Sequence, residues 1–168
     1  MSLSIVCQTD TPTVLMSSGD TVAVDIVAAA STPFHANAAD LVVEFDSLRL
    51  AFVGFTTPDY FPDARLFGLY EKVGGIWRLD KTLTDGDLGV TAWAAMMGSD
   101  VTRYPAVVPE GLLVATLQFR PIAAGEAFVR LSANPARHAT SRTKLYDASV
   151  PNYQRFADVM LGAVVEIQ

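Results

Sequence analysis

The stretch AADLVVEFDSLRLAFVGF, residues 38–55, contains two short strands joined by a turn. Side chains point alternately to the two faces of a strand. The first strand therefore has an apolar face, which carries Ala39, Leu41, Val43 and Phe45. Its other face is more acidic and carries Asp40, Val42, Glu44 and Asp46. The second strand, Leu48–Phe55, is apolar on both faces, with Leu50 and Phe52 on one and Val53 and Phe55 on the other. Its second face must be covered by another part of the fold or by a partner.

The segments on either side of this stretch also have the features of strands. They are short, alternate in polarity or are β-prone, and are separated by turn residues, and none is a convincing amphipathic helix. The further predicted strands are Leu3–Gln8, Thr13–Met16, Thr21–Ala29, Arg65–Lys72, Ile76–Leu83, Leu88–Ala95, Leu112–Phe119, Phe128–Ser132 and Val159–Ile167. Many short strands with turns at regular intervals predict an all-β chain folded as an antiparallel sandwich or jelly roll.

Two parts of this pattern carry more specific expectations. The glycine-bearing turns VGG and TDGD predict that the three segments between residues 65 and 95 form a meander. The final segment alternates along its whole length and is expected to be a central strand. Its predicted inward residues are Val159, Leu161, Ala163, Val165 and Ile167.

Length and composition predict one folded domain, residues 1–168. The chain is 51% hydrophobic and 18% charged, which excludes a disordered chain. Its net charge of −6 argues against a nucleic-acid partner, and no apolar run is long enough for insertion into a membrane. The single cysteine, Cys7, cannot form an intramolecular disulfide, and its apolar neighbours indicate a buried side chain.

The sequence lacks the residue constellations that are typical of enzymes. The two histidines, His35 and His138, lie in expected loops, the G-x-S-x-G motif is absent, and acidic residues are scattered along strands. The motif TDGD (84–87) offers two carboxylates around a glycine, but Asp-Gly is the commonest hairpin signal, so a turn is favoured over a metal site. We therefore predict a chain that is not an enzyme, with no cofactor and no metal.

Aromatic side chains provide a second functional hypothesis, because rings pack against the apolar faces of sugars. Tyr60 and Phe61 lie between prolines in the loop TTPDYFPDA, and Trp77 and Trp93 lie in neighbouring strands of the predicted meander. These four rings are candidates for stacking against a polysaccharide. The alternative for the two tryptophans is that they pack in the core.

Three stretches, taken in order, resemble a cohesin domain. GDTVAVDIVAA (19–29) is similar to the early cohesin strand that follows a Gly-Asp turn. The opening stretch (38–55) is similar to the strand–turn–strand unit, with Phe45-Asp46 as the aromatic-Asp pair that ends its first strand. GLLVATLQFRPIAAGEAFVRLS (111–132) resembles the late hairpin of that family. The resemblance implies a nine-stranded β-sandwich with jelly-roll topology. It also implies a non-catalytic receptor that docks a calcium-loaded dockerin module on one sheet face.

The apolar residues of the opening stretch would contribute to such a docking face. The predicted partner-binding residues are Val42, Glu44, Val53 and Phe55. Two alternatives stay open: a carbohydrate-binding module, and a structural spacer or adhesin module without a specific ligand. The start MSLSIVCQTD lacks the features of a signal peptide. It fits either a cytoplasmic protein or, as we favour, an extracellular or cell-surface module within a longer chain.

Overall fold

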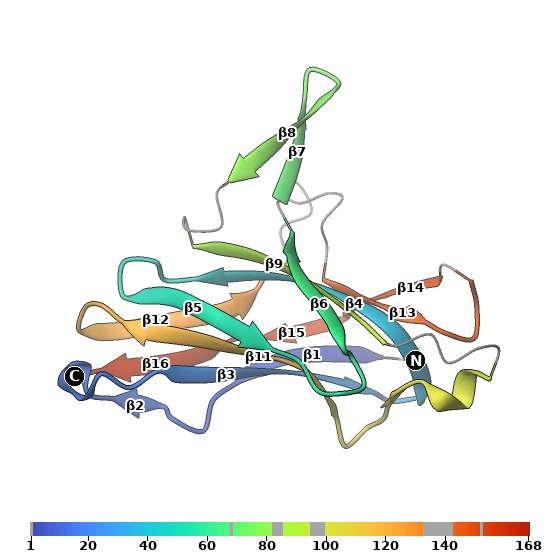
Figure 1. The fold of residues 1–168 in the computed structure, drawn as a ribbon, viewed down its shortest axis with the longest axis horizontal. Helices are drawn as coiled ribbons and strands as arrows, with labels where there is room; N and C mark the ends of the chain where they lie inside the picture. The colour runs from blue at the N-terminus through green and yellow to red at the C-terminus, as the bar shows by residue number, and fades with distance from the viewer. Residues whose placement is uncertain (1, 68, 82–85, 95–99, 133–142, 152) are drawn as a thin grey trace.

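The computed structural model describes residues 2–67, 69–81, 86–94, 100–132, 143–151 and 153–168. Within these ranges the chain forms sixteen strands and two short 3-10 turns, Met16–Ser18 and Val101–Arg103, and it contains no α-helix. Two sheets pack face to face, and a separate hairpin projects from the body of the sandwich (Figure 1). The predicted all-β sandwich is confirmed.

The smaller sheet has five strands and is called here the β3 sheet, after its central strand. Its order is β15-β1-β3-β11-β5. In that order the bounds are Val159–Leu161, Leu3–Gln8, Val22–Ala30, Leu112–Pro121 and Leu50–Thr56.

The larger sheet has nine strands and is called the β4 sheet. Its main path is β14-β13-β4-β12-β16-β2, with bounds Tyr153–Phe156, Lys144–Asp147, Phe34–Phe45, Gly125–Leu131, Ala163–Ile167 and Thr13–Val14. Strand β4 also pairs with β9 (Asp87–Trp93) and with β10 (Ala106–Val107), and β9 pairs with β6 (Asp63–Phe67). Strand β4 is therefore the element that joins the parts of this sheet.

Both sheets are mixed, so the prediction of a purely antiparallel sandwich is wrong at two pairings. Strand β1 pairs in parallel with β15, and β2 pairs in parallel with β16. Both pairings arise because the final segment is split at Gly162 and continues in the other sheet. A Cβ atom at residue 162 would lie 2.9 Å from Cβ of Arg130, so the close approach of these two segments favours glycine at residue 162.

This split also corrects the expected direction of two side chains in the last segment. Ala163, Val165 and Ile167 are buried, as predicted. Val159 and Leu161 are 45% and 58% exposed instead of facing the core, because β15 aligns them with the outward residues of β1.

The core between the sheets is formed by the inward residues of both. On β4 these include Ala39, Leu41, Val43 and Phe45, all buried, as the alternation of the opening stretch predicts. Phe45 meets Phe119 of β11 across the sandwich, with ring centroids 5.1 Å apart. The two sheets are therefore joined by aromatic as well as aliphatic contacts.

The apolar residues of β5 do not keep to one parity along the sequence, because the strand contains a β-bulge. Its pairing with β11 shifts between Gln118 and Phe119, so that Phe52 lies opposite Phe119 while Phe55 lies opposite Leu117. Phe119 and Leu117 are fully buried, and both Phe52 and Phe55 pack against the core. Val53 is the extra residue and is 51% exposed. The expectation that Phe55 points outward with Val53 is therefore wrong.

The predicted meander is correct only in part. Strands β7 (Leu69–Val73) and β8 (Ile76–Lys81) form a hairpin, and its turn contains Gly74 and Gly75, whose positive φ angles of 57° and 84° suit glycine. This hairpin is a sheet of its own in the described part of the chain, while β9 lies in the β4 sheet. Trp77 and Trp93 are therefore in different sheets.

Candidate functional site

The outer face of the β4 sheet carries exposed aromatic, aliphatic and charged side chains from three adjacent strands. In β12 the residues Ala127, Val129 and Leu131 are buried, so Phe128 and Arg130 point outward. The register places Arg130 opposite Glu44 of β4, and Phe128 opposite Val164 of β16. We call these four residues, Glu44, Phe128, Arg130 and Val164, the β12 surface.

Hydrogen bonds hold the charged half of the β12 surface in place. Arg130 Nε donates to Oε2 of Glu44 at 3.0 Å, and Ser132 Oγ donates to Oε1 of Glu44 at 2.9 Å. The guanidinium of Arg130 lies 4.7 Å from the ring centroid of Phe128. Phe128 and Val164 nevertheless remain 37% and 52% exposed. The β12 surface thus combines a fixed ion pair with an accessible apolar pair.

A hollow of about 550 Å³ lies further along the same sheet. Residues of β4, β9 and β13 line it, together with Ala94, which follows β9, and Tyr104, which follows the second 3-10 turn. We call it the Trp93 hollow; its lining residues are Asn37, Ala38, Asp40, Thr91, Trp93, Ala94, Tyr104 and Tyr146.

The carboxylate of Asp40 is the centre of the polar contacts in this hollow. Thr91 Oγ1 donates to Oδ1 of Asp40 at 2.8 Å, and the Tyr146 hydroxyl donates to Oδ2 at 2.8 Å. Nζ of Lys144 lies 3.4 Å from the same Oδ2. Burial raises the pKa of Tyr146 well above its usual range, and both the hydrogen bond to Asp40 and the negative charge of Asp40 raise this pKa further. Tyr146 therefore stays protonated and donates its proton to Asp40.

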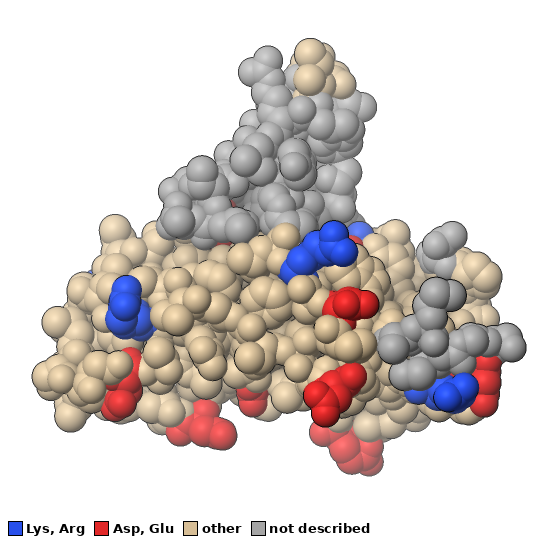
Figure 2. Space-filling view, in the orientation of Figure 1, with Lys and Arg blue, Asp and Glu red and all other residues tan. Residues whose placement is uncertain are grey.

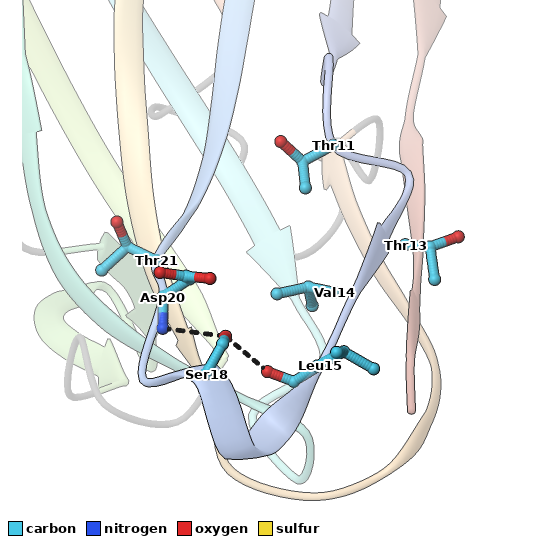
Figure 3. A pocket seen from close by; sticks show the side chains of 7 residues that line it. All are labelled: Thr11, Thr13, Val14, Leu15, Ser18, Asp20 and Thr21. Carbon is cyan, nitrogen blue, oxygen red and sulfur yellow. Dashed lines mark hydrogen bonds between the residues drawn. The ribbon is translucent and has the colours of Figure 1, made fainter.

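A second hollow, of about 430 Å³, lies beside β2 and is lined mainly by hydroxyl groups (Figure 3). Ser18 Oγ donates to the carbonyl oxygen of Leu15 at 2.7 Å and accepts a hydrogen bond from the Asp20 N–H at 3.2 Å. These bonds stabilise the turn between β2 and β3. The lining contains no aromatic ring, so this hollow lacks a platform for a flat ligand.

The structure separates the four residues predicted to bind a partner. Glu44 belongs to the β12 surface, and Val42 points to the same outer side of β4 but is fully buried. Val53 and Phe55 lie on β5 in the opposite sheet, and Phe55 packs against the core. The expectation of one shared apolar face is therefore wrong. Of the three apolar residues predicted to bind a partner, Val42, Val53 and Phe55, only Val53 is exposed.

The four aromatic residues predicted to stack against sugars are also separated. Phe61 is fully buried in the core, so it offers no accessible ring. Tyr60 packs edge-on against Phe61 and donates its hydroxyl proton to the carbonyl oxygen of Leu113 at 2.7 Å. The side chain of Trp77 lies outside the described residues. Trp93 lines the Trp93 hollow.

The groups considered for catalysis or metal binding have structural contacts where they are described. His35 Nδ1 lies 2.7 Å from the carbonyl oxygen of Tyr104, while His138 and residues 84 and 85 of TDGD lie outside the described residues. No group of three or more His, Cys, Asp or Glu side chains suited to a metal occurs among the residues that the structure describes. No helix among them is long and apolar enough to span a membrane.

Sequence reasoning missed Phe128, Arg130 and Val164 of the β12 surface and Tyr146 of the Trp93 hollow. For Phe128 and Arg130 a signal existed, since both alternate with small or aliphatic residues in EAFVRLS (126–132). For Tyr146 none existed, because it reaches the hollow from a distant segment through the pairing of β13 with β4.

Comparison with solved structures finds the same fold in cohesin domains. A type II cohesin domain from the cellulosome of Acetivibrio cellulolyticus matches with a TM-score of 0.64 and 18% identity, over 98% of this chain and 95% of that one. A cohesin in a type II cohesin–X-dockerin complex from the same organism matches with a TM-score of 0.65 and 13% identity, over 99% and 100% of the two chains.

A third match is a cohesin from a type I cohesin–dockerin complex of Clostridium thermocellum. Its TM-score is 0.61 at 13% identity, and the match covers 100% of both chains. No family model matches the sequence, and no curated protein does.

The two packed sheets define a β-sandwich, and the β12 surface lies on its solvent-facing side. More particularly, the chain has the cohesin fold over its whole length. The resemblance found in three stretches of sequence is therefore confirmed at the level of the fold.

Proposed function

We propose that the chain is a non-catalytic recognition module that docks a dockerin-like protein on the β12 surface. The observation that carries this proposal is the full-length match to cohesins, several of which were solved in complexes with dockerins. The proposal also places the module outside the cell or on its surface, within a longer chain. The cellulosomal source of one matched cohesin supports this location.

The β12 surface has the composition of a docking site. Aromatic and arginine side chains are enriched among the residues that contribute most to protein interfaces. Phe128 and Val164 provide exposed apolar area, and Arg130 provides a positive charge next to them that is hydrogen-bonded to Glu44. Because its hydrogen bond to Glu44 already limits the positions that the Arg130 side chain can take, a partner that pairs with it loses less conformational entropy on binding.

The opposite face of the sandwich is the competing surface. Figure 2 shows almost no charged side chains over β5 and β11, with acidic groups gathered along the lower rim of that view. Charged groups across an interface fix register and exclude wrong partners. The β3 sheet therefore offers a partner fewer of the contacts that give specificity.

A binding panel with matched variants tests this proposal. The purified domain is titrated by calorimetry with a set of dockerin modules, with calcium and with a chelator. Arg130→Glu places a negative charge beside Glu44 and is expected to weaken docking at least about tenfold, or about 1.4 kcal/mol. Val53→Glu, a charge introduced at an exposed position of the other sheet, is expected to leave docking unchanged within about twofold.

Two results would overturn the proposal. If no dockerin binds under either condition, the chain is not a dockerin receptor. If Val53→Glu abolishes docking while Arg130→Glu does not, the docking face is the β3 sheet and the assignment of the β12 surface is wrong.

A further inference from the structure

The Trp93 hollow brings together aromatic rings and hydrogen-bonding side chains in one concave site. Three aromatic residues line it, Trp93, Tyr104 and Tyr146, together with the polar side chains of Asn37, Asp40 and Thr91. Its volume of about 550 Å³ lies within the range of small-molecule sites, about 300–1,000 Å³. A ligand for this hollow must therefore offer an apolar face and several polar groups at once.

The charges around the hollow argue against a cationic ligand. Asp40, its acidic residue, is already paired with Lys144, whose side chain is only 9% exposed. The guanidinium of Arg65 lies 4.8 Å from the centroid of the Trp93 ring. An aromatic cage attracts a cation when its rings and carboxylate lack positive partners. Here the Asp40 carboxylate already has Lys144 as its positive partner, and the Trp93 ring already has Arg65, so a further cation would be repelled.

The polar groups argue equally against a purely apolar ligand. Burying Asp40 and Asn37 under an apolar group would remove water without replacing its hydrogen bonds, which is unfavourable. A carboxylate offers about four lone-pair positions, and those of Asp40 have three partners, Thr91, Tyr146 and Lys144. One acceptor position remains for a hydroxyl donor, and the Asn37 amide adds donors and an acceptor.

We propose that the Trp93 hollow binds a neutral sugar unit of a glycan. A pyranose ring has an apolar C–H face, which packs against an aromatic ring, and a rim of hydroxyls, which are both donors and acceptors. Trp93 supplies the ring, and Asp40 and Asn37 supply the hydrogen-bonding partners. Tyr146 positions Asp40 through its 2.8 Å hydrogen bond. This site is separate from the β12 surface and does not depend on dockerin binding.

The test uses the whole domain and a panel of soluble neutral oligosaccharides, including β-linked glucose, xylose and mannose series. Binding is followed by backbone amide chemical shifts in the unaltered protein. Shifts for at least one series are expected at residues 37, 38, 40, 91 and 94, and not at the β12 surface. This readout needs no variant, so it is independent of any effect of mutation on folding.

Variants then assign the contacts. Trp93→Ala is expected to weaken sugar binding at least about tenfold, and Tyr146→Phe, which keeps the ring, to weaken it about threefold to tenfold because Asp40 loses its donor. Tyr153→Ala, at a 48% exposed tyrosine outside the hollow, is the control and is expected to change binding less than twofold. Dockerin binding by Trp93→Ala is expected to stay intact.

The proposal is overturned if no neutral oligosaccharide shifts these amides at millimolar concentration, or if Trp93→Ala binds sugar as well as the unaltered protein. It is also overturned if a dockerin, and no sugar, perturbs the lining residues, because the hollow would then be part of the protein interface. Loss of dockerin binding alone would count against the proposed function and leave the sugar site standing.

Discussion

Asp147, which is buried, forms an ion pair with the partly buried Arg155, and this pair ties β13 to β14. Arg155 Nε donates to Oδ2 of Asp147 at 2.7 Å, and Ser149 donates to Oδ1 through its N–H at 2.9 Å and its hydroxyl at 2.6 Å. The guanidinium also lies against the rings of Phe34 and Tyr153. A buried charge stays stable only when it is paired and hydrogen-bonded. This pair therefore holds the edge of the β4 sheet beyond the Trp93 hollow.

The pH dependence of stability follows from the pKa of Asp147. Burial alone would raise this pKa, but the hydrogen bonds from Ser149 and the contact with Arg155 outweigh burial and hold it below its usual value. The unfolded chain has a pKa of about 3.9 at this group. The stabilising contribution is therefore present above about pH 4 and is lost as the pH falls through the lower pKa of the folded state.

We expect Asp147→Asn to flatten the acid limb of the stability profile. The measurement is the free energy of unfolding in urea between about pH 6 and about pH 2.5 for both proteins. The unaltered protein should lose more free energy over this interval than the variant. Equal losses would show that Asp147 does not titrate with unfolding.

Cys7 provides a second check on a single side chain. It is 4% exposed, and burial raises the pKa of its thiol to about 12. Because the thiolate is the reactive form, we expect no reaction with a chromogenic disulfide reagent at neutral pH in the native protein. One equivalent should react in denaturant. Rapid reaction of the folded protein would contradict the packing of β1 against the core.

The bulge in β5 makes opposite predictions for two neighbouring apolar residues. Phe55→Ala removes a ring that packs against the core and is expected to cost about 2–3 kcal/mol of unfolding free energy. Val53→Ala trims the exposed extra residue and should change stability by less than about 0.5 kcal/mol. Denaturant unfolding of the two variants measures both values. Similar losses would mean that Val53 and Phe55 share a face, as simple alternation predicts.

The two strands of residues 38–55 show which part of the fold could be predicted from the sequence. The inward face of β4 from Ala39 to Phe45 was predictable, because each core residue in this part is separated from the next by one outward residue. The bulge in β5 was not, because it depends on how β5 pairs with β11, more than fifty residues later. The split at Gly162 had a signal in VMLGAVV (159–165), since an isolated glycine in a strand pattern marks a break or a close approach.

The β7–β8 hairpin is the element least tied to the sandwich. In the described part of the chain its two strands pair only with each other (Figure 1). Replacing residues 69–81 by a short Gly-Ser turn is therefore expected to change the unfolding free energy by less than about 1 kcal/mol, or about 2–4 °C in the melting temperature. Thermal unfolding measures the change. Loss of cooperative unfolding would show that the hairpin contributes to the core.

The candidate site combines predictable and unpredictable residues for the same physical reason. The sequence predicted Glu44 as a partner-binding residue and Trp93 as a sugar-stacking residue, and each lies on the outer face of the β4 sheet. Their neighbours come from elsewhere: Arg130 is opposite Glu44, and Tyr146 reaches Asp40 across β13 and β4. Local alternation predicts the direction of a side chain, whereas only the order and register of the strands determine which side chains lie next to it.

Strand β4 connects the two proposed binding regions of the molecule. Glu44, near one end, belongs to the β12 surface, and Asp40, four residues earlier, belongs to the Trp93 hollow. Four residues of strand span about 14 Å. A dockerin-sized partner on the β12 surface and a sugar in the hollow would therefore be close neighbours on one sheet face.

The most direct test of the docking proposal is to map the interface by nuclear magnetic resonance. The labelled domain is titrated, in calcium, with the dockerin that binds it most tightly. We expect amide shifts to cluster on β4, β12 and β16, around residues 44, 128, 130 and 164. Shifts confined to β3, β5 and β11, or no shifts with any dockerin, would contradict the assignment of the β12 surface as the docking face.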